Sequence, residues 1–404
     1  MKEKYYKYAE LLLKRGLYIN SNQPLVINAP IESVEFVRVL TDVACNLGVR
    51  DIYYDWSDEA LKHTQLVYFD EEDIKASRFW NKTIHDEYAK KNAAFLFLAA
   101  SSNMMQDIDS NKLRVALSNS LNTRKTYRDM QMNNDVAWCI ASVATEEWGK
   151  IVFPDVENSY ELLWNKIFDI CLVNSDNPIS EWDEKLKKNH QMCQKLNELN
   201  IKELHYKSSN GTDLVVGLPE KCIWAGGSSV IKGRELIVNL PTEEVFTTPN
   251  KFLTNGIIYS SLPLVHAGTV INDICLKFEN GKVVSFDASS GVDELKNIIE
   301  FDIESSMLGE IALVDINSKI AKSNILFYET LYDENASCHI ALGSGFKECI
   351  SGGIDMDEDS LEKVGYNKSR NHVDIMVGTN DLNIIAVTYD GRELLMFKNG
   401  SFNI

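Results

Sequence analysis

The sequence predicts a parallel-sheet α/β domain followed by a mixed, mainly antiparallel α+β domain. The chain has 404 residues, more than one ordinary hydrophobic core accommodates. In the first half, apolar strand-like runs alternate with amphipathic helical runs, which is typical of parallel strands joined by helices. After about residue 203 the apolar runs are short and alternate every second residue, which favours antiparallel strands. We therefore expect an α/β domain over 1–185 and a β-rich domain over 186–404.

The first half is expected to begin with an amphipathic helix over 4–15. Apolar strands follow at 24–28, 51–55, 93–100 and 137–144. The helices between and after them are expected at 31–47, 71–91, 111–130, 158–173 and 180–199. No GxGxxG or Walker motif follows any of these strands, so nothing in the residues supports nucleotide binding by this sheet.

The second half is punctuated by turn signals. Asn280-Gly281 and Asp390-Gly391 stand between alternating runs, and Asn399-Gly400 follows the last long one. Asn and Gly tolerate positive φ, so the first two pairs predict hairpins. Helices are expected at about 291–306 and 358–365. This half is therefore mostly antiparallel β-structure.

The charge balance argues against two classes of partner. Lys and Arg number 41 against 59 Asp and Glu, which gives a formal net charge of −18. Such a field repels nucleic acid and anionic membrane surfaces. No apolar run reaches the roughly 20 residues that span a bilayer, and charges flank the only apolar cluster of the N-terminus. We expect neither nucleic acid nor membrane as a partner.

The cysteines predict a reducing compartment. The chain has eight of them, with no CxxC pair: Cys45, Cys139, Cys171, Cys193, Cys222, Cys275, Cys338 and Cys349. A chain of this size needs no disulfide staples, so free thiols in the cytoplasm are expected. The scattered spacing also argues against a zinc site made of thiolates.

A pair of strand residues has the spacing of metal ligands. His372 and Asp374 in NHVDIMVG are two residues apart, so both side chains emerge on one face of a strand. An imidazole beside a carboxylate suits Zn, Co or Mn. The polar face of an ordinary strand has the same spacing, so the pair alone decides nothing. Glu243 and Glu244 in NLPTEEVFTTP are adjacent, so at most one can face such a site from an extended backbone.

Each of the other candidate residues has a functional and a structural interpretation. Glu310 in MLGEIALV is a possible ligand or a surface acid, and His339 in DENASCHIALG is a possible ligand or a satisfied core histidine. His266 in PLVHAG either lines the site or belongs to a loop. Gly226 and Gly227 either approach a substrate or form a simple tight turn.

Several runs, in matching order along nearly the whole chain, carry a family resemblance. They include WCIASVATEEWGKIVFPD, WAGGSSVIKG, NLPTEEVFT, LGEIALV, ILFYETLYDENASCHIALG and HVDIMVG. The sequence resembles the M29 family of metalloaminopeptidases, the aminopeptidase T and aminopeptidase S group. DENASCH and PTEEVFT are the specific motifs, and the WAGG and LGE motifs support them.

The resemblance implies a ligand set at the matching motif positions: Glu244, Glu310, His339, His372 and Asp374. The family's spacing between the PTEEVFT and LGE glutamates is reproduced here and selects Glu244 over Glu243. Three carboxylates and two histidines suit two divalent ions about 3.5–4 Å apart, with one carboxylate bridging them. The ions implied are Zn, Co or Mn.

The activity implied is removal of N-terminal residues from small peptides by a metal-activated water, in a homodimer. Glu243 is a candidate to carry a proton to the leaving amine. A related option is hydrolysis of other amides by the same ions.

One departure from the family concerns catalysis directly. Phe346 stands where the family has an active-site tyrosine. A phenol can donate to the developing oxyanion, and losing one such donor costs about 10²–10³ in rate. The sequence leaves open whether the hydroxyl of Tyr328, Tyr332 or Tyr366 takes the place of the missing phenol in the folded protein. The alternative function is therefore a family member with reduced or lost catalysis that binds metal or peptides.

Overall fold

The computed structural model describes residues 1–76 and 79–404. They form two compact units. One consists of Met1–Lys185 with Ser228–Pro241, and the other of Leu186–Gly227 with Thr242–Ile404. The expected fold class, a parallel α/β sheet followed by mainly antiparallel sheets, is confirmed. None of the helices in the described ranges is long and apolar enough to cross a membrane.

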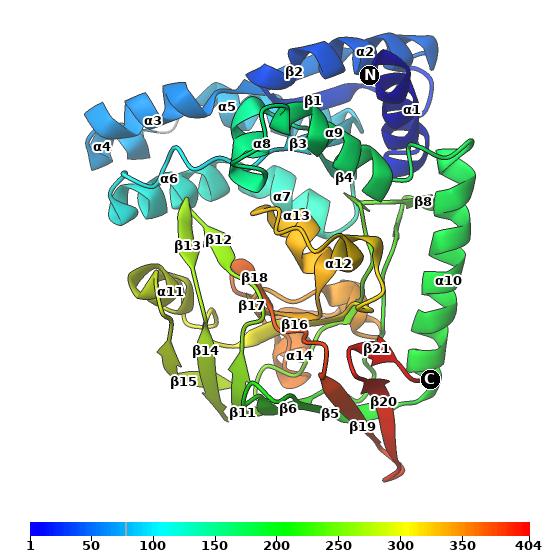
Figure 1. The fold of residues 1–404 in the computed structure, drawn as a ribbon, viewed down its shortest axis with the longest axis vertical. Coiled ribbons are helices and arrows are strands. Elements are labelled where there is room, and N and C mark those ends of the chain that lie inside the picture. Colours follow the sequence, from blue (N-terminus) through cyan, green and yellow to red (C-terminus); the bar gives the residue numbers. More distant parts are fainter. Residues whose placement is uncertain (77–78) are drawn as a thin grey trace. The chain divides into compact units, whose positions relative to one another are not determined.

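The first unit contains a five-stranded parallel sheet in the order β2-β1-β3-β4-β9 (Figure 1). Its strands are β1 (Leu25–Pro30), β2 (Ile52–Ser57), β3 (Ala94–Ala99), β4 (Ala137–Ser142) and β9 (Asn239–Leu240). Its helices are α1 (Lys2–Leu11), α2 (Val34–Asn46), α3 (Glu59–Tyr68), α4 (Glu71–Lys75), α5 (Phe79–Lys90), α6 (Ser110–Thr123), α7 (Lys125–Met132), α8 (Glu146–Val152) and α9 (Ser159–Ile170). Helix α10 (Pro178–Glu198) carries the chain into the second unit.

The helices differ from the expected ones in several places. Two positions of the expected helix 71–91, residues 77 and 78, lie outside the described ranges, and α4 and α5 flank them. The expected helix 111–130 is divided into α6 and α7 at Arg124. Within the described part of this unit, the sequence missed α3 and α8, and side-chain caps start both: Asp58 accepts the Leu61 N–H at 3.0 Å, and Thr145 accepts the Trp148 N–H at 3.1 Å.

Residues 228–241 lie in the first unit, although the sequence assigns them to the β-rich domain. They form a hairpin, β7 (Ser229–Ile231) and β8 (Arg234–Leu236), and then β9, which pairs in parallel with β4. Arg15, 8% exposed, holds them through the Glu235 carbonyl and carboxylate, both at 2.7 Å. These bonds join residues far apart in the sequence, so no local pattern predicts them.

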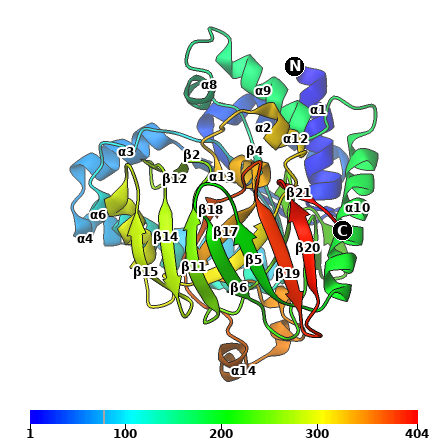
Figure 2. The same cartoon turned by 60° about the horizontal axis from the view of Figure 1, so that its bottom comes forward.

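The second unit contains an eight-stranded antiparallel sheet, most of whose strands lie side by side in Figure 2. In spatial order its strands are β15 (Lys282–Asp287), β14 (Cys275–Glu279), β11 (Thr254–Tyr259), β6 (Asp213–Gly217), β5 (Ile201–Lys207), β19 (Asn383–Thr388), β20 (Glu393–Lys398) and β21 (Ser401–Phe402). Asn280 and Gly281, both at positive φ, form the predicted turn between β14 and β15.

A smaller antiparallel sheet has the order β10 (Val245–Thr247), β16 (Leu308–Leu313), β17 (His339–Gly343) and β18 (His372–Met376). The short hairpin β12 (Leu264–His266) and β13 (Thr269–Ile271) and the helices α11 (Val292–Ile299), α12 (Lys319–Ser323), α13 (Thr330–Asp333) and α14 (Glu358–Lys363) complete the unit. Helix α11 is shorter than the helix expected over 291–306.

One hydrophobic core lies between the eight-stranded and the four-stranded sheet. It contains Ile311, Ile340 and Val373 from the smaller sheet, packed with Leu204 and Phe278 from the larger one. Side chains alternate between the two faces of a strand, so the residues next to Ile311, Ile340 and Val373 point away from this core. The four-stranded sheet is therefore the element that can present polar groups on its other face.

Candidate metal centre

The face of the four-stranded sheet opposite the core carries the predicted metal ligands. His339 begins β17, Glu310 lies on β16, and His372 and Asp374 share β18, where the core residue Val373 separates them. Glu244 directly precedes β10. In the strand register, Ala341 of β17 lies between Glu310 and Asp374. The small Ala341 methyl group leaves room above the sheet between these two carboxylates.

Gly309 of the LGE motif determines the direction of the Glu310 side chain. The register of β16 against β17 shifts between Leu308 and Glu310, which is a β-bulge. A Cβ atom at Gly309 would lie 2.1 Å from the carbonyl oxygen of Gly343 and 2.3 Å from that of Ser344. Only glycine fits this close approach, and the bulge redirects the residue that follows.

The five predicted ligands form two groups that share Glu310. One group is Glu244, Glu310 and His339, and the other is Glu310, His372 and Asp374. Within each group, one ligand atom per residue lies within 4.8 Å of the others. His339 Nε2 is 3.1 Å from Glu244 Oε2, and His372 Nε2 is 3.1 Å from Glu310 Oε2 and 3.3 Å from Asp374 Oδ1.

Backbone carbonyls orient both imidazoles. His339 Nδ1 donates toward the carbonyl oxygens of Glu334, at 3.1 Å, and Ser337, at 3.2 Å. His372 Nδ1 donates to the Ser344 carbonyl oxygen at 2.8 Å. A carbonyl only accepts, so each Nδ1 carries the proton, and each Nε2 faces the carboxylates as a potential ligand.

The buried acids repel one another. Burial raises the pKa of Glu310 to about 7, and the charges of Glu244 and Asp374 add to the increase. Burial also favours the neutral form of Asp374, but the neighbouring imidazole of His372 outweighs it and lowers the pKa. For both imidazoles burial lowers the pKa, yet the surrounding carboxylates outweigh burial and raise it well above its usual value.

This donor set fits divalent cations. Asp374 Oδ1 is buried and, among the described residues, meets no hydrogen-bond donor in good geometry, although His372 Nε2 lies 3.3 Å away. Carboxylate oxygens with neutral imidazole nitrogens suit zinc and its neighbours in the first transition series. A cation would relieve the carboxylate repulsion and displace protons from the imidazoles, so its affinity must increase with pH.

Sequence reasoning missed Glu334. Its side chain is 8% exposed, and burial raises its pKa well above the usual value, with the charges of Asp374 and Glu244 adding to the shift. Glu334 Oε1 accepts Asn335 Nδ2 at 3.2 Å, while Asn335 Oδ1 accepts the Glu243 N–H at 2.6 Å. The available signal was an acidic residue inside the specific DENASCH motif.

The two predicted catalytic residues lie in different places. Glu243 is half-buried, and within the described residues neither ligand group includes it. Phe346 lies at the His372 end, with ring centroids 5.3 Å apart in an edge-to-face arrangement and 5.1 Å between Phe346 and Phe246. Thr248 fixes its backbone, because Thr248 Oγ1 accepts the Phe346 N–H at 2.8 Å.

The remaining histidine candidate, His266, contacts an acid outside the two ligand groups. Its Nδ1 lies 2.7 Å from Glu294 Oε1. Neither ligand group within the described ranges contains it.

Comparisons with known proteins identify the class of this fold and site. The family model described as thermophilic metalloprotease (M29) matches residues 1–402. Aminopeptidase AmpS of Bacillus subtilis is 37% identical over 399 residues, covering 98% of this chain and 97% of its own. Aminopeptidase T of Thermus thermophilus is 32% identical over 398 residues, with the same coverage of both chains.

A solved structure supports the same assignment. Wild-type AmpT from Thermus thermophilus superposes with a TM-score of 0.92 at 31% identity, covering 100% of both chains. The chain belongs to the M29 family of metalloproteases, and it is accordingly an enzyme that hydrolyses peptide bonds. The family expected from the motifs is confirmed.

Proposed function

We propose that this protein is a two-metal aminopeptidase that removes N-terminal residues from peptides. Glu244, Glu310, His339, His372 and Asp374 hold two divalent ions in this proposal. The observation that carries it is the division of these residues into two groups sharing Glu310, which suits a bridging carboxylate. The names of the relatives, all aminopeptidases, support the choice of the peptide N-terminus.

Two divalent ions bound here would polarise the scissile carbonyl and lower the pKa of a water molecule to a usable value. The protein supplies the orientation: the carbonyls of Glu334 and Ser344 keep each Nε2 directed at the carboxylates. Glu243 is proposed to carry a proton to the leaving amine. Glu334, which lies close enough to Glu244 and Asp374 to interact with their charges, is a sixth candidate ligand.

The finer expectations belong to the same proposal. The ions are Zn, Co or Mn, the substrates are small peptides, and the enzyme is a homodimer. We propose a cytoplasmic location, supported by eight free cysteines. The residues of 186–404 other than 228–241, which form the second unit, are proposed as the catalytic domain, and 1–185 as part of a separate α/β domain.

A second candidate function is a family member with reduced catalysis that binds metal or peptides. The observation behind it is the Phe346 ring, which lies beside His372 and has no hydroxyl to donate.

One experiment tests the proposed function. The chelator-treated protein is titrated with Zn²⁺, Co²⁺ or Mn²⁺, and cleavage of an aminoacyl chromogenic substrate is measured beside its N-acetylated form. We expect two equivalents of bound metal and turnover of the free amine only. Metal binding without turnover of any aminoacyl substrate would favour the second candidate. Equal cleavage of the acetylated substrate would indicate another amide hydrolase.

A further inference from the structure

A buried amide joins the two strands that carry Glu310 and His372. Asn367 has no exposed surface, and its Nδ2 lies 3.0 Å from the carbonyl oxygen of Glu304 and 3.1 Å from that of Met307. A third carbonyl oxygen, that of Leu308, lies at 3.4 Å. Leu308 begins β16, so the amide fixes the start of the strand that carries Glu310.

The backbone around Asn367 fixes the segment that holds His372. The Asn367 carbonyl accepts the Gly345 N–H at 2.9 Å, and the Asn371 carbonyl accepts the Ser344 N–H at 2.7 Å. The Ser344 carbonyl is the acceptor of His372 Nδ1. The peptide that orients the imidazole is therefore tied to the 366–371 segment on both of its sides.

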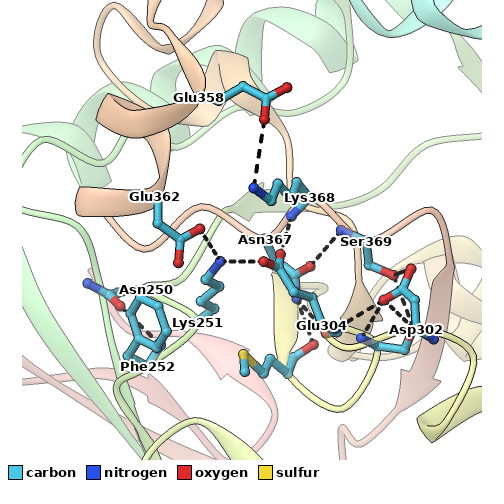
Figure 3. Close-up of polar contacts among 12 residues, drawn as sticks. Asn250, Lys251, Phe252, Asp302, Glu304, Glu358, Glu362, Asn367, Lys368 and Ser369 are labelled. Atoms are coloured by element: carbon cyan, nitrogen blue, oxygen red, sulfur yellow. Dashed lines mark hydrogen bonds and ion pairs between the residues drawn. The ribbon is translucent and has the colours of Figure 1, made fainter.

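A buried ion pair between Lys251 and Glu304 lies close to Asn367 (Figure 3). Lys251 is 1% exposed, and its Nζ lies 2.8 Å from Glu304 Oε1 and 2.8 Å from Glu362 Oε2. The second oxygen of Glu304 accepts the Lys368 N–H at 2.7 Å. Glu304 thus connects the ammonium to the residue next to Asn367, whereas Glu362 has a side chain that is 46% exposed.

The geometry points to a positioning role for this network of Lys251, Glu304 and Asn367. We propose that it sets the distance between Glu310 and His372, and so the affinity of the Glu310, His372 and Asp374 group for its cation. The inference rests on the proposed two-metal function. A buried ion pair contributes little net stability compared with well-packed apolar side chains, so we attribute its burial to the geometry that it imposes. Mutation of a residue that orients a metal ligand typically lowers the affinity for the metal about 10–100-fold.

The effect should be larger for the group that contains His372 than for the group that contains His339, although both groups share Glu310. The network reaches His372 through Ser344, whereas His339 is oriented by the carbonyls of Glu334 and Ser337. A change in the network should therefore weaken the binding of one cation more than that of the other.

The test compares Glu304→Gln with Glu362→Gln, the same substitution on two partners of one ammonium. A glutamine at 304 has a single oxygen for two donors, Lys251 Nζ and the Lys368 N–H, so its NH₂ group must face one of them. A glutamine at 362 can turn toward solvent. Zn²⁺ is titrated into the chelator-treated full-length proteins by calorimetry. We expect Glu304→Gln to bind one equivalent at least about tenfold more weakly, and Glu362→Gln to match the wild type.

The outcomes separate the two proposals. Wild type with two equivalents and equal affinities in both variants would overturn the positioning role alone. If the wild type binds only one equivalent of Zn²⁺, the two-metal function is overturned. The positioning role then stands if Glu304→Gln lowers the affinity for that one ion, and it falls if the affinity is unchanged. Wild type without bound Zn²⁺ would overturn both. Where Glu304→Gln does not fold, Asn367→Asp removes the amide donor to the three carbonyls and gives the same comparison.

Discussion

The two ends of the ligand cluster differ in access to solvent. The His339 side chain is 1% exposed and the Glu244 side chain 9%, whereas the His372 side chain is 28% exposed. Position in the sheet does not explain the difference, because Asp374 shares the edge strand β18 with His372 and its side chain is only 11% exposed. The most exposed side chain of the cluster is therefore the one that lies beside Phe346, and we expect a peptide to approach from this end.

Glu310 belongs to both ends, so its loss should have the largest effect. We expect Glu310→Gln to lower kcat/KM by roughly a thousandfold or more, since ions of this kind supply several kcal/mol of transition-state stabilisation. Steady-state kinetics with Zn²⁺, together with metal analysis, measure it. Glu362→Gln is the matched control. A Glu310→Gln protein that keeps both its activity and its metal would break the idea of a shared ligand.

The difference in exposure predicts a difference in chemical rescue. His372→Ala leaves a space open to solvent, so added imidazole should restore Zn²⁺ affinity and activity by about tenfold. His339→Ala leaves a space closed by protein, and imidazole should not restore it, because protein interiors are close-packed. The measurement is Zn²⁺ affinity and turnover with and without imidazole. Equal rescue of both variants would remove the distinction between the two ends.

The hydroxyl missing at position 346 predicts a gain of activity when it is restored. Phe346→Tyr should raise kcat by up to about a hundredfold, because a phenol at the open end can donate to the developing oxyanion. KM should change less, since the hydroxyl acts mainly in the transition state. Kinetics at equal metal content measure both constants. Phe246→Tyr, on the neighbouring ring, is the control and should not gain.

An unchanged or lower kcat for Phe346→Tyr would mean that another group already serves as the donor. Of the three tyrosines considered for this role, Tyr366 has its hydroxyl engaged, because it donates to the Gly345 carbonyl oxygen at 3.0 Å.

Local pattern alone determined the type of each sheet and the family. Helix-separated apolar runs imply parallel strands, and Asn280-Gly281 implies a hairpin, since both follow from residues close together in the chain. The motifs indicated five candidate ligands, which the structure brings together, and His372 with Asp374 already showed the alternation that places both on one face.

Only the tertiary structure decided which segments support those ligands. Residues 228–241 belong to the first unit through bonds to Arg15, and Asn367 contacts carbonyls about sixty positions earlier in the chain. Glu334 and Lys251 carry charges that, in sequence, are typical of a solvated surface. Their burial depends on what the fold brings against them, and that long-range packing leaves no periodic signal in the sequence.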